Sequence, residues 1–151
     1  MRKYEREKST EDKYDRERRI RKFYVVVFAK QLAVYTAQVT ANEKYFPARY
    51  RLTFTDKMIA KSLDIVDLLV EANEILPDSR ESCMLRFSRQ REALAEFRSL
   101  ETMIDVAKTL LHLPDNKVEY WSNLLFKARS AAASWYLSDR KRFGVKYRDI
   151  V

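Results

Sequence analysis

The residues that could support catalysis or hold a metal are few in this chain. It contains one histidine, His112, and one cysteine, Cys83. A di-iron site in a helix bundle needs paired Glu-x-x-His motifs, and a zinc site needs several histidine or cysteine ligands. A serine or cysteine nucleophile would depend on the same single histidine as its base. The residue types therefore predict no catalytic residue, no metal site, no cofactor and a non-enzymatic protein.

The basic residues carry more information. The chain has 30 lysines and arginines against 22 acidic residues, a net charge of +8. Such an excess favours an anionic partner, and a cation that neutralises a phosphate makes binding depend on salt. The basic residues gather around residue 50, along the segment that begins at residue 80, and near residue 140. The predicted nucleic-acid or partner-binding residues are Arg49, Arg51, Lys57, Arg86, Arg89, Arg91, Arg98, Arg140, Lys141 and Arg142.

Two alternatives stay open for these charges and for the aromatics beside them. The basic clusters could be solvated faces with local ion pairs, since residues 64–74 contain four acidic residues and no basic one. The aromatic residues of the connector could stack on unpaired bases or could pack the connector onto the core. These aromatics are Tyr45, Phe46, Tyr50 and Phe54. The sequence shows no recognition-helix turn, so base-specific reading is not predicted.

The elements that must position these residues are long helices. One glycine and three prolines in the whole chain leave few sites for turns or helix breaks. Apolar residues recur at helical spacing in residues 19–45, 56–76, 80–112 and 116–142. Short connections between four such helices predict an all-α, antiparallel up-down-up-down four-helix bundle.

The spacing also predicts which side chains face the core. In the first two helices the expected inner faces are Tyr24, Phe28, Gln31, Leu32, Tyr35 and Val39, then Ile59, Leu63, Val66, Leu69 or Val70, and Asn73. In the last two they are Leu85, Phe87, Leu94, Phe97, Leu100, Ile104, Ala107 and Leu111, then Val118, Trp121, Leu125, Ala128, Ala132 and Trp135. Tyr35, Phe126, Trp135 and Tyr136 are expected either to need a neighbouring subunit or to fill the bundle's own core.

Local signals predict where the helices begin and end. Pro47 interrupts the first helix, because the residue before a proline disfavours helical angles. Thr53 or Thr55 is expected to start the second helix, and Thr53 with Asp56 matches a capping box. Asp78 or Ser79 is expected to cap the third helix. His112 is expected at the C-terminus of the third helix, where a positive charge is favourable.

The chain divides into three parts. Residues 1–19 form a charged arm, a helical extension or disordered, since residues 1–22 carry ten basic and six acidic residues. Residues 20–142 form the bundle, and residues 143–151 form a basic tail. The apolar run at residues 23–29 is too short to span a bilayer, and a single cysteine fits a reducing compartment. We therefore expect a cytoplasmic protein with no membrane contact.

The motifs FPARYRLT at residues 46–53 and LLVEAN at residues 68–73 lead to a family. With Leu94, Arg98 and the small-residue stretch at residues 128–135, the chain resembles the accessory variability determinant proteins of diversity-generating retroelements. These belong to a wider four-helix-bundle family that includes proteins encoded in intervening sequences of 23S ribosomal RNA genes. The resemblance covers residues 20–142.

The resemblance implies a ring-shaped homopentamer with a basic surface and no catalytic activity. Its partners would be the element's reverse transcriptase and template RNA, so that it supports mutagenic reverse transcription and retrohoming. Arg98 is similar to a basic residue that recurs midway along the third helix of the family. Arg49 and Arg51 are similar to the basic residues of the connector motif. The alternatives are a structural adaptor of the 23S intervening-sequence type and a basic helical accessory protein of DNA mobilisation.

Overall fold

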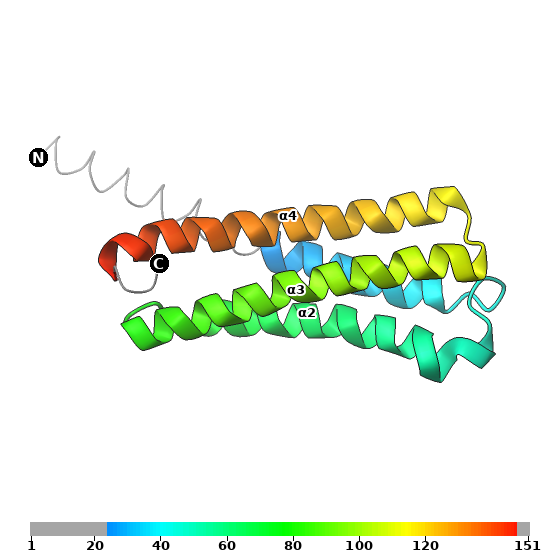
Figure 1. The fold of residues 1–151 in the computed structure, drawn as a ribbon, viewed down its shortest axis with the longest axis horizontal. Coiled ribbons are helices and arrows are strands. Elements are labelled where there is room, and N and C mark those ends of the chain that lie inside the picture. The colour runs from blue at the N-terminus through cyan, green and yellow to red at the C-terminus, as the bar shows by residue number, and fades with distance from the viewer. Residues whose placement is uncertain (1–23, 148–151) are drawn as a thin grey trace, which may run out of the picture.

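A computed structural model of the chain describes residues 24–147, and this part is all helical (Figure 1). The first helix covers residues 24–40, and the others are α2 (Asp56–Glu74), α3 (Arg80–Leu111) and α4 (Asp115–Lys146). A 3-10 turn (Ala48–Tyr50) and a π-helical turn (Arg51–Thr55) precede α2. The predicted four-helix, all-α fold is confirmed. The predicted arm at residues 1–19 lies outside the described residues.

Neighbouring helices run in opposite directions. Arg86, early in α3, bonds Asp139 near the end of α4, whereas Glu101, later in α3, bonds the earlier Arg129. The same reversed order holds for Glu71–Arg89 and Lys61–Glu96 between α2 and α3, and for Phe28–Lys127 and Thr36–Trp121 between the first helix and α4. The colour gradient follows this alternation along α2, α3 and α4 in Figure 1. The up-down-up-down order follows from these contacts.

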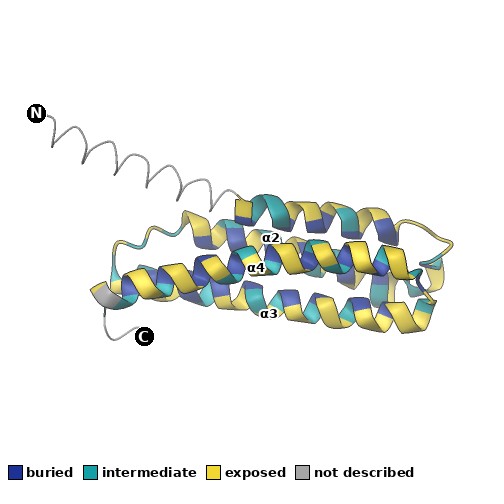
Figure 2. Cartoon of the chain, turned by 90° about the horizontal axis from the view of Figure 1, so that it is seen from above, coloured by how far each residue is buried: buried dark blue, intermediate teal, exposed yellow. Residues whose placement is uncertain are grey.

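Each helix buries one seam whose members are alternately three and four residues apart. The seams are Val25, Ala29, Leu32, Thr36 and Val39; Thr55, Met58, Ser62, Ile65, Leu69 and Ala72; Cys83, Arg86, Gln90, Ala93, Phe97, Leu100, Ile104 and Ala107; and Val118, Trp121, Leu125, Ala128, Ala132, Trp135 and Asp139. Figure 2 shows these seams as recurring dark bands along the helices. This heptad spacing is that of bundles whose helices cross at about 20°. Each fully buried large apolar side chain contributes about 1.5–3 kcal/mol.

The predicted inner faces of the first two helices are turned by about one residue. Tyr24 is 48% exposed and Leu63 is 52% exposed, while Val25 and Ser62 lie in the core. The second helix has two apolar stripes side by side, and residues 59, 63, 66 and 70 form the outer one. Periodicity sets the spacing of a stripe, but it does not say which of two adjacent stripes meets a partner helix.

The predicted inner faces of the last two helices agree better. Phe87 to Ala107 and Val118 to Trp135 are buried or partly buried where expected, with Leu85 exposed instead. Among the residues considered for a subunit contact, Phe126 is 61% exposed. Trp135 and Tyr136 are buried, and Tyr35 packs against the core of the same chain.

The connector before α2 differs from the predicted capping box. Pro47 has extended angles, and helical geometry begins directly after it. Thr55 already has helical angles and makes no capping bond, so neither threonine starts the helix. The amide of Asp56 donates to the carbonyl of Arg51, five residues back, which defines the π-helical turn. The capping-box prediction is therefore wrong, because helical turns already satisfy these amides.

The other helix ends are closer to expectation. Ser79 caps α3 and accepts a hydrogen bond from the Ser82 amide at 3.1 Å. His112 follows α3 with left-handed angles (φ 52°) and ends the helix, a position where glycine is usual. The first helix stops at residue 40 rather than 45, and α4 continues to Lys146 rather than residue 142. Residues 143–146 of the predicted tail therefore belong to α4, with Phe143 buried.

Candidate nucleic-acid interface

The connector presents Arg49 and Arg51, and the first turn of α2 presents Lys57, on the surface at one end of the bundle. The Arg49 guanidinium lies 5.0 Å from the Tyr50 ring centroid. The Arg51 Nη2 lies 3.5 Å from a carboxylate oxygen of Glu43, and both side chains are largely exposed. An exposed pair of this kind contributes less than about 1 kcal/mol, so it does not withhold Arg51 from a partner.

The predicted basic residues of α3 fall into different environments. Arg91 and Arg98 are exposed. Arg89 is held between two acids: its Nε lies 3.0 Å from Glu71 and its Nη1 lies 3.1 Å from Glu92. The charge of Arg89 is thus balanced locally, and it adds little to the field seen by an anion.

The last two turns of α4 present Arg140, Lys141 and Arg142, followed by Lys146. The guanidinium groups of Arg140 and Arg142 lie 5.6 and 5.5 Å from the ring centroids of Tyr136 and Phe143. Within residues 24–147, none of these four cations pairs with a carboxylate. This end of α4 is therefore strongly cationic.

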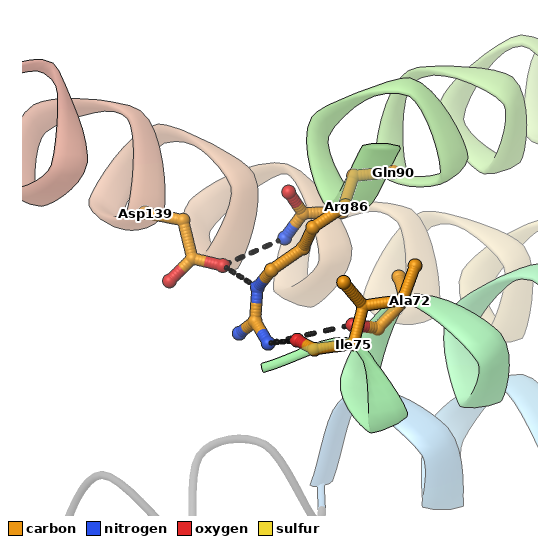
Figure 3. Close-up of polar contacts among 5 residues, drawn as sticks. All are labelled: Ala72, Ile75, Arg86, Gln90 and Asp139. Atoms are coloured by element: carbon orange, nitrogen blue, oxygen red, sulfur yellow. Dashed lines mark hydrogen bonds and ion pairs between the residues drawn. The ribbon is translucent and has the colours of Figure 1, made fainter. Parts of the chain in front are cut away.

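Arg86 does not belong to the exposed surface, so its assignment as a binding residue is wrong. The side chain is 1% exposed, and its Nε donates to Asp139 Oδ2 at 2.8 Å (Figure 3). Its Nη1 donates to the carbonyl of Ile75 at 2.9 Å, where α2 ends. A charge this deep in a bundle persists only when a counter-charge and hydrogen bonds satisfy it. Arg86 thus fastens α2, α3 and α4 together.

Further polar atoms surround this buried ion pair. Gln90 Nε2 donates to the same Asp139 oxygen at 3.0 Å, and the Arg86 guanidinium lies 5.0 Å from the Trp135 ring centroid. Arg86 Nη2, Gln90 Oε1 and Trp135 Nε1 are buried without a hydrogen-bond partner within the described chain. The hydrogen bonds that join Arg86 and Gln90 of α3 to Asp139 of α4 and to the Ile75 carbonyl after α2 form together only in one alignment of these helices. The buried polar cluster therefore specifies how the three helices align.

The ten predicted residues do not form one surface. Arg86 bonds Asp139, so the start of α3 and the end of α4 share one end of the bundle. The connector with Arg49 and Arg51 and the start of α2 with Lys57 lie at the other end, where Figure 1 shows the segment that leads into α2. At 1.5 Å per helical residue the two groups are on the order of 30 Å apart. Arg98 lies between them along α3.

Charge is divided between pairs of helices. Residues 24–42 together with α4 contain eight basic and three acidic residues, and one of these acids is the buried Asp139. Helices α2 and α3 contain eight basic and ten acidic residues. The sequence-based prediction placed much of the basic surface on α3, where acids of α2 and α3 offset it. The face of the first helix and α4 was missed, although the scarcity of acids in those segments was visible in the sequence.

Comparisons of the chain with protein-family models, curated proteins and solved structures give no match. No helix in the described range is long and apolar enough to cross a membrane. Over the same range, no three histidine, cysteine, aspartate or glutamate side chains gather as a metal-binding group.

Cys83 gives a test of how firmly this end of the bundle is closed. The thiol is fully buried beside Phe87, Tyr136 and Phe143, and burial raises its pKa, against a lowering by the nearby Arg86 charge. We expect Cys83 to react with a thiol reagent on the order of a hundredfold more slowly in the native protein than in denaturant. At pH 8 a smaller fraction of the native thiol than of a free cysteine is the reactive thiolate, so the native reaction should stay slower at that pH as well. A fast native reaction would show that the end of α4 opens readily.

Proposed function

We propose that this protein is a non-enzymatic accessory protein that binds nucleic acid through its basic surface. In its specific form, it serves a diversity-generating retroelement and binds the reverse transcriptase and template RNA of that element. One observation carries the proposal: Arg140, Lys141, Arg142 and Lys146 crowd the end of α4, while the one carboxylate among them, Asp139, is turned inward to Arg86. The resemblance of residues 46–53 and 68–73 to the retroelement family supports the specific form.

The number of cations exceeds what the helix needs for its own stability. A helix C-terminus carries about half a negative charge, and one or two cations are enough to balance it. Four cations in the last two turns leave a positive field that extends into solvent. A phosphate backbone is the partner whose charge spacing suits such a cluster.

Binding of a labelled structured RNA, measured by fluorescence anisotropy over a salt series, tests the general proposal. We expect the variant with Lys141→Gln and Arg142→Gln to bind about tenfold more weakly, with the slope of log K against log salt reduced by about 1 for each residue. Its helicity by circular dichroism should be unchanged, because Lys141 and Arg142 are exposed and make no ion pair within the described chain.

A matched control separates position from total charge. The variant with Ala60→Glu and Asn73→Glu also lowers the net charge by two, at exposed positions of α2 on the acidic side. It should bind nearly as well as the wild type. A further variant with Arg49→Glu and Arg51→Glu reports whether the connector contributes, and we expect it to remain folded and to bind more weakly. Equal binding by all variants, or binding unaffected by salt, would remove the support for nucleic-acid contact.

The retroelement form has a separate test. Co-expression with a reverse transcriptase encoded beside this gene, followed by affinity purification, should recover a complex of the two proteins. In that complex this chain should be present as a homo-oligomer. The variant with Arg49→Glu and Arg51→Glu should reduce the recovered complex. A gene neighbourhood without a reverse transcriptase, or absence of a complex, would leave the adaptor alternative.

A further inference from the structure

A row of aromatic and lysine side chains follows the edge where the first helix meets α4. The first helix and the turn after it contribute Tyr24, Phe28, Tyr35, Lys44 and Tyr45; α4 contributes Lys117, Tyr120 and Lys127. We refer to these eight residues as the aromatic–lysine row. None of them is among the binding residues predicted from the basic clusters.

The row follows one edge of the bundle because the two helices are antiparallel. Lys127 Nζ lies 4.2 Å from the Phe28 ring centroid, and the rings of Tyr35 and Tyr120 meet edge to face at 4.7 Å. Further along, Lys117 Nζ lies 5.2 Å from the centroid of Tyr45. The α4 residue numbers of these three contacts fall from 127 to 120 to 117 as those of their partners rise from 28 to 35 to 45, so the contacts lie in order along one edge. Figure 2 shows α4 between α3 and the first helix, so this edge is on the side of α4 away from α3.

Two of the rings are about half exposed to solvent. Tyr24 is 48% exposed and Tyr120 is 54% exposed. Lys44, Lys117 and Lys127 contact rings and form no ion pair within the described chain. A lysine over a ring keeps its full charge, since the ring attracts the ammonium group without neutralising it. The row therefore offers flat apolar surfaces and uncompensated positive charges side by side.

The surroundings of the row contain few acids. Residues 24–42 contain no aspartate or glutamate, and after its first residue α4 has only Glu119 and the buried Asp139. Glu43, in the turn, lies 3.5 Å from Arg51. A polyanion that approaches this edge thus meets little repulsion. A duplex would use the charges but not the rings, because its bases are stacked inside.

We propose that the aromatic–lysine row binds an unpaired stretch of RNA, an inference that rests on the proposed function and names the part of the nucleic acid that this surface takes. Tyr24 and Tyr120 stack on bases, and Lys44, Lys117 and Lys127 contact phosphates. The first helix and the turn, from residue 24 to 45, extend over roughly 30 Å, the length of about nine stacked nucleotides. Stacking on aromatics is tolerant of sequence, which agrees with the prediction from the sequence that no base-specific reading occurs.

The test compares a labelled single-stranded adenine RNA of about twelve nucleotides, longer than the row, with a blunt RNA duplex of the same length. We expect Tyr120→Leu and Tyr24→Leu each to weaken single-strand binding at least about fivefold, with the salt slope and the duplex affinity unchanged. The variant with Lys117→Gln and Lys127→Gln should instead reduce the single-strand salt slope by about 0.7 per residue. Tyr120→Phe should bind as the wild type does, because it keeps the ring.

Phe126→Leu is the matched control for the tyrosine variants. Phe126 is also an exposed aromatic of α4, but it lies by Arg129, which bonds Glu101 of α3, and so it is outside the row. Its loss should leave binding unchanged. Circular dichroism of every variant checks that the helices are kept. If Tyr120→Leu disturbs the packing on Tyr35, Tyr24→Leu provides the test of base stacking in its place.

The outcomes separate this inference from the proposed function. If the wild type binds single-stranded RNA and loses affinity with Lys141→Gln and Arg142→Gln, but not with the tyrosine or Lys117 and Lys127 variants, the inference is overturned and the proposed function stands. If the tyrosine variants fail while the α4-end variant binds normally, the row is the site and the α4 end is not. Absence of any RNA binding by the folded wild type would overturn both.

Discussion

Asp139→Ala is expected to lower the free energy of unfolding by about 3–5 kcal/mol, although it removes a single carboxylate. The reason is that Arg86 would remain fully buried without its carboxylate. The hydrogen bond from Arg86 Nη1 to the Ile75 carbonyl would also weaken as the unpaired guanidinium moves toward solvent, so the end of α2 should loosen. Urea denaturation followed by circular dichroism measures the loss.

A double variant distinguishes the cost of an unpaired buried charge from the contribution of the ion pair itself. Arg86→Met with Asp139→Leu fills the same space with apolar groups and should recover most of the lost stability, since well-packed hydrophobic replacements of buried pairs are often neutral or stabilising. Glu119→Ala, an exposed acid of the same helix, should change stability by less than about 0.5 kcal/mol. A loss below about 1 kcal/mol for Asp139→Ala would mean that Arg86 escapes to solvent without difficulty.

Trp121→Ala is expected to cost about 3–5 kcal/mol, from lost burial and the cavity that remains. The indole is fully buried, and its ring meets those of Phe46 and Tyr35 edge to face. Its Nε1 donates to Thr36 Oγ1 at 3.0 Å. Because Phe46 begins the connector, the cavity should also loosen the segment that presents Arg49. Thermal unfolding and binding of structured RNA measure the two effects.

Two milder substitutions separate the contribution of the Trp121 ring volume from that of its hydrogen bond to Thr36. Trp121→Phe keeps most of the volume and removes one hydrogen bond, so it should cost clearly less than Trp121→Ala. Thr36→Val leaves the indole donor buried without an acceptor, which should cost about 1–3 kcal/mol. Equal stability of Trp121→Ala and the wild type would contradict the packing of the connector onto this indole.

The scarcity of glycine and proline, together with short connections, was enough to predict the helical fold and its alternating order. Ser79 was predictable as the cap of α3 from its residue type. The inner face of α4 was predictable because residues 118, 121, 125, 128, 132 and 135 keep the three-and-four spacing, and these residues are buried. The inner face of α2 was not, since Ile59 and Met58 head stripes of the same period, and tertiary contacts decide between them.

The candidate site was predicted less well, for two physical reasons. Arg86 was assigned to the surface because it is charged, although Cys83, Arg86, Gln90 and Ala93 keep the seam spacing of three and four residues. Tyr24 was assigned to the core because it keeps helical spacing with Phe28, although the adjacent stripe that begins at Val25 is the buried one. Residue type thus misled the prediction for Arg86, and spacing alone did not decide between two adjacent stripes for Tyr24.

The π-helical turn at Arg51–Thr55 sets the direction in which the connector leaves the axis of α2, as well as the connector's length. A π turn holds one residue more than an α turn, so loss of one residue there would restore an ordinary helix. Everything before it would then rotate by about 100° around the axis of α2. Arg49 would be carried to another side of the bundle while every helix stayed folded. The number of residues in this turn, and not only their identity, therefore decides which way the connector's arginines face.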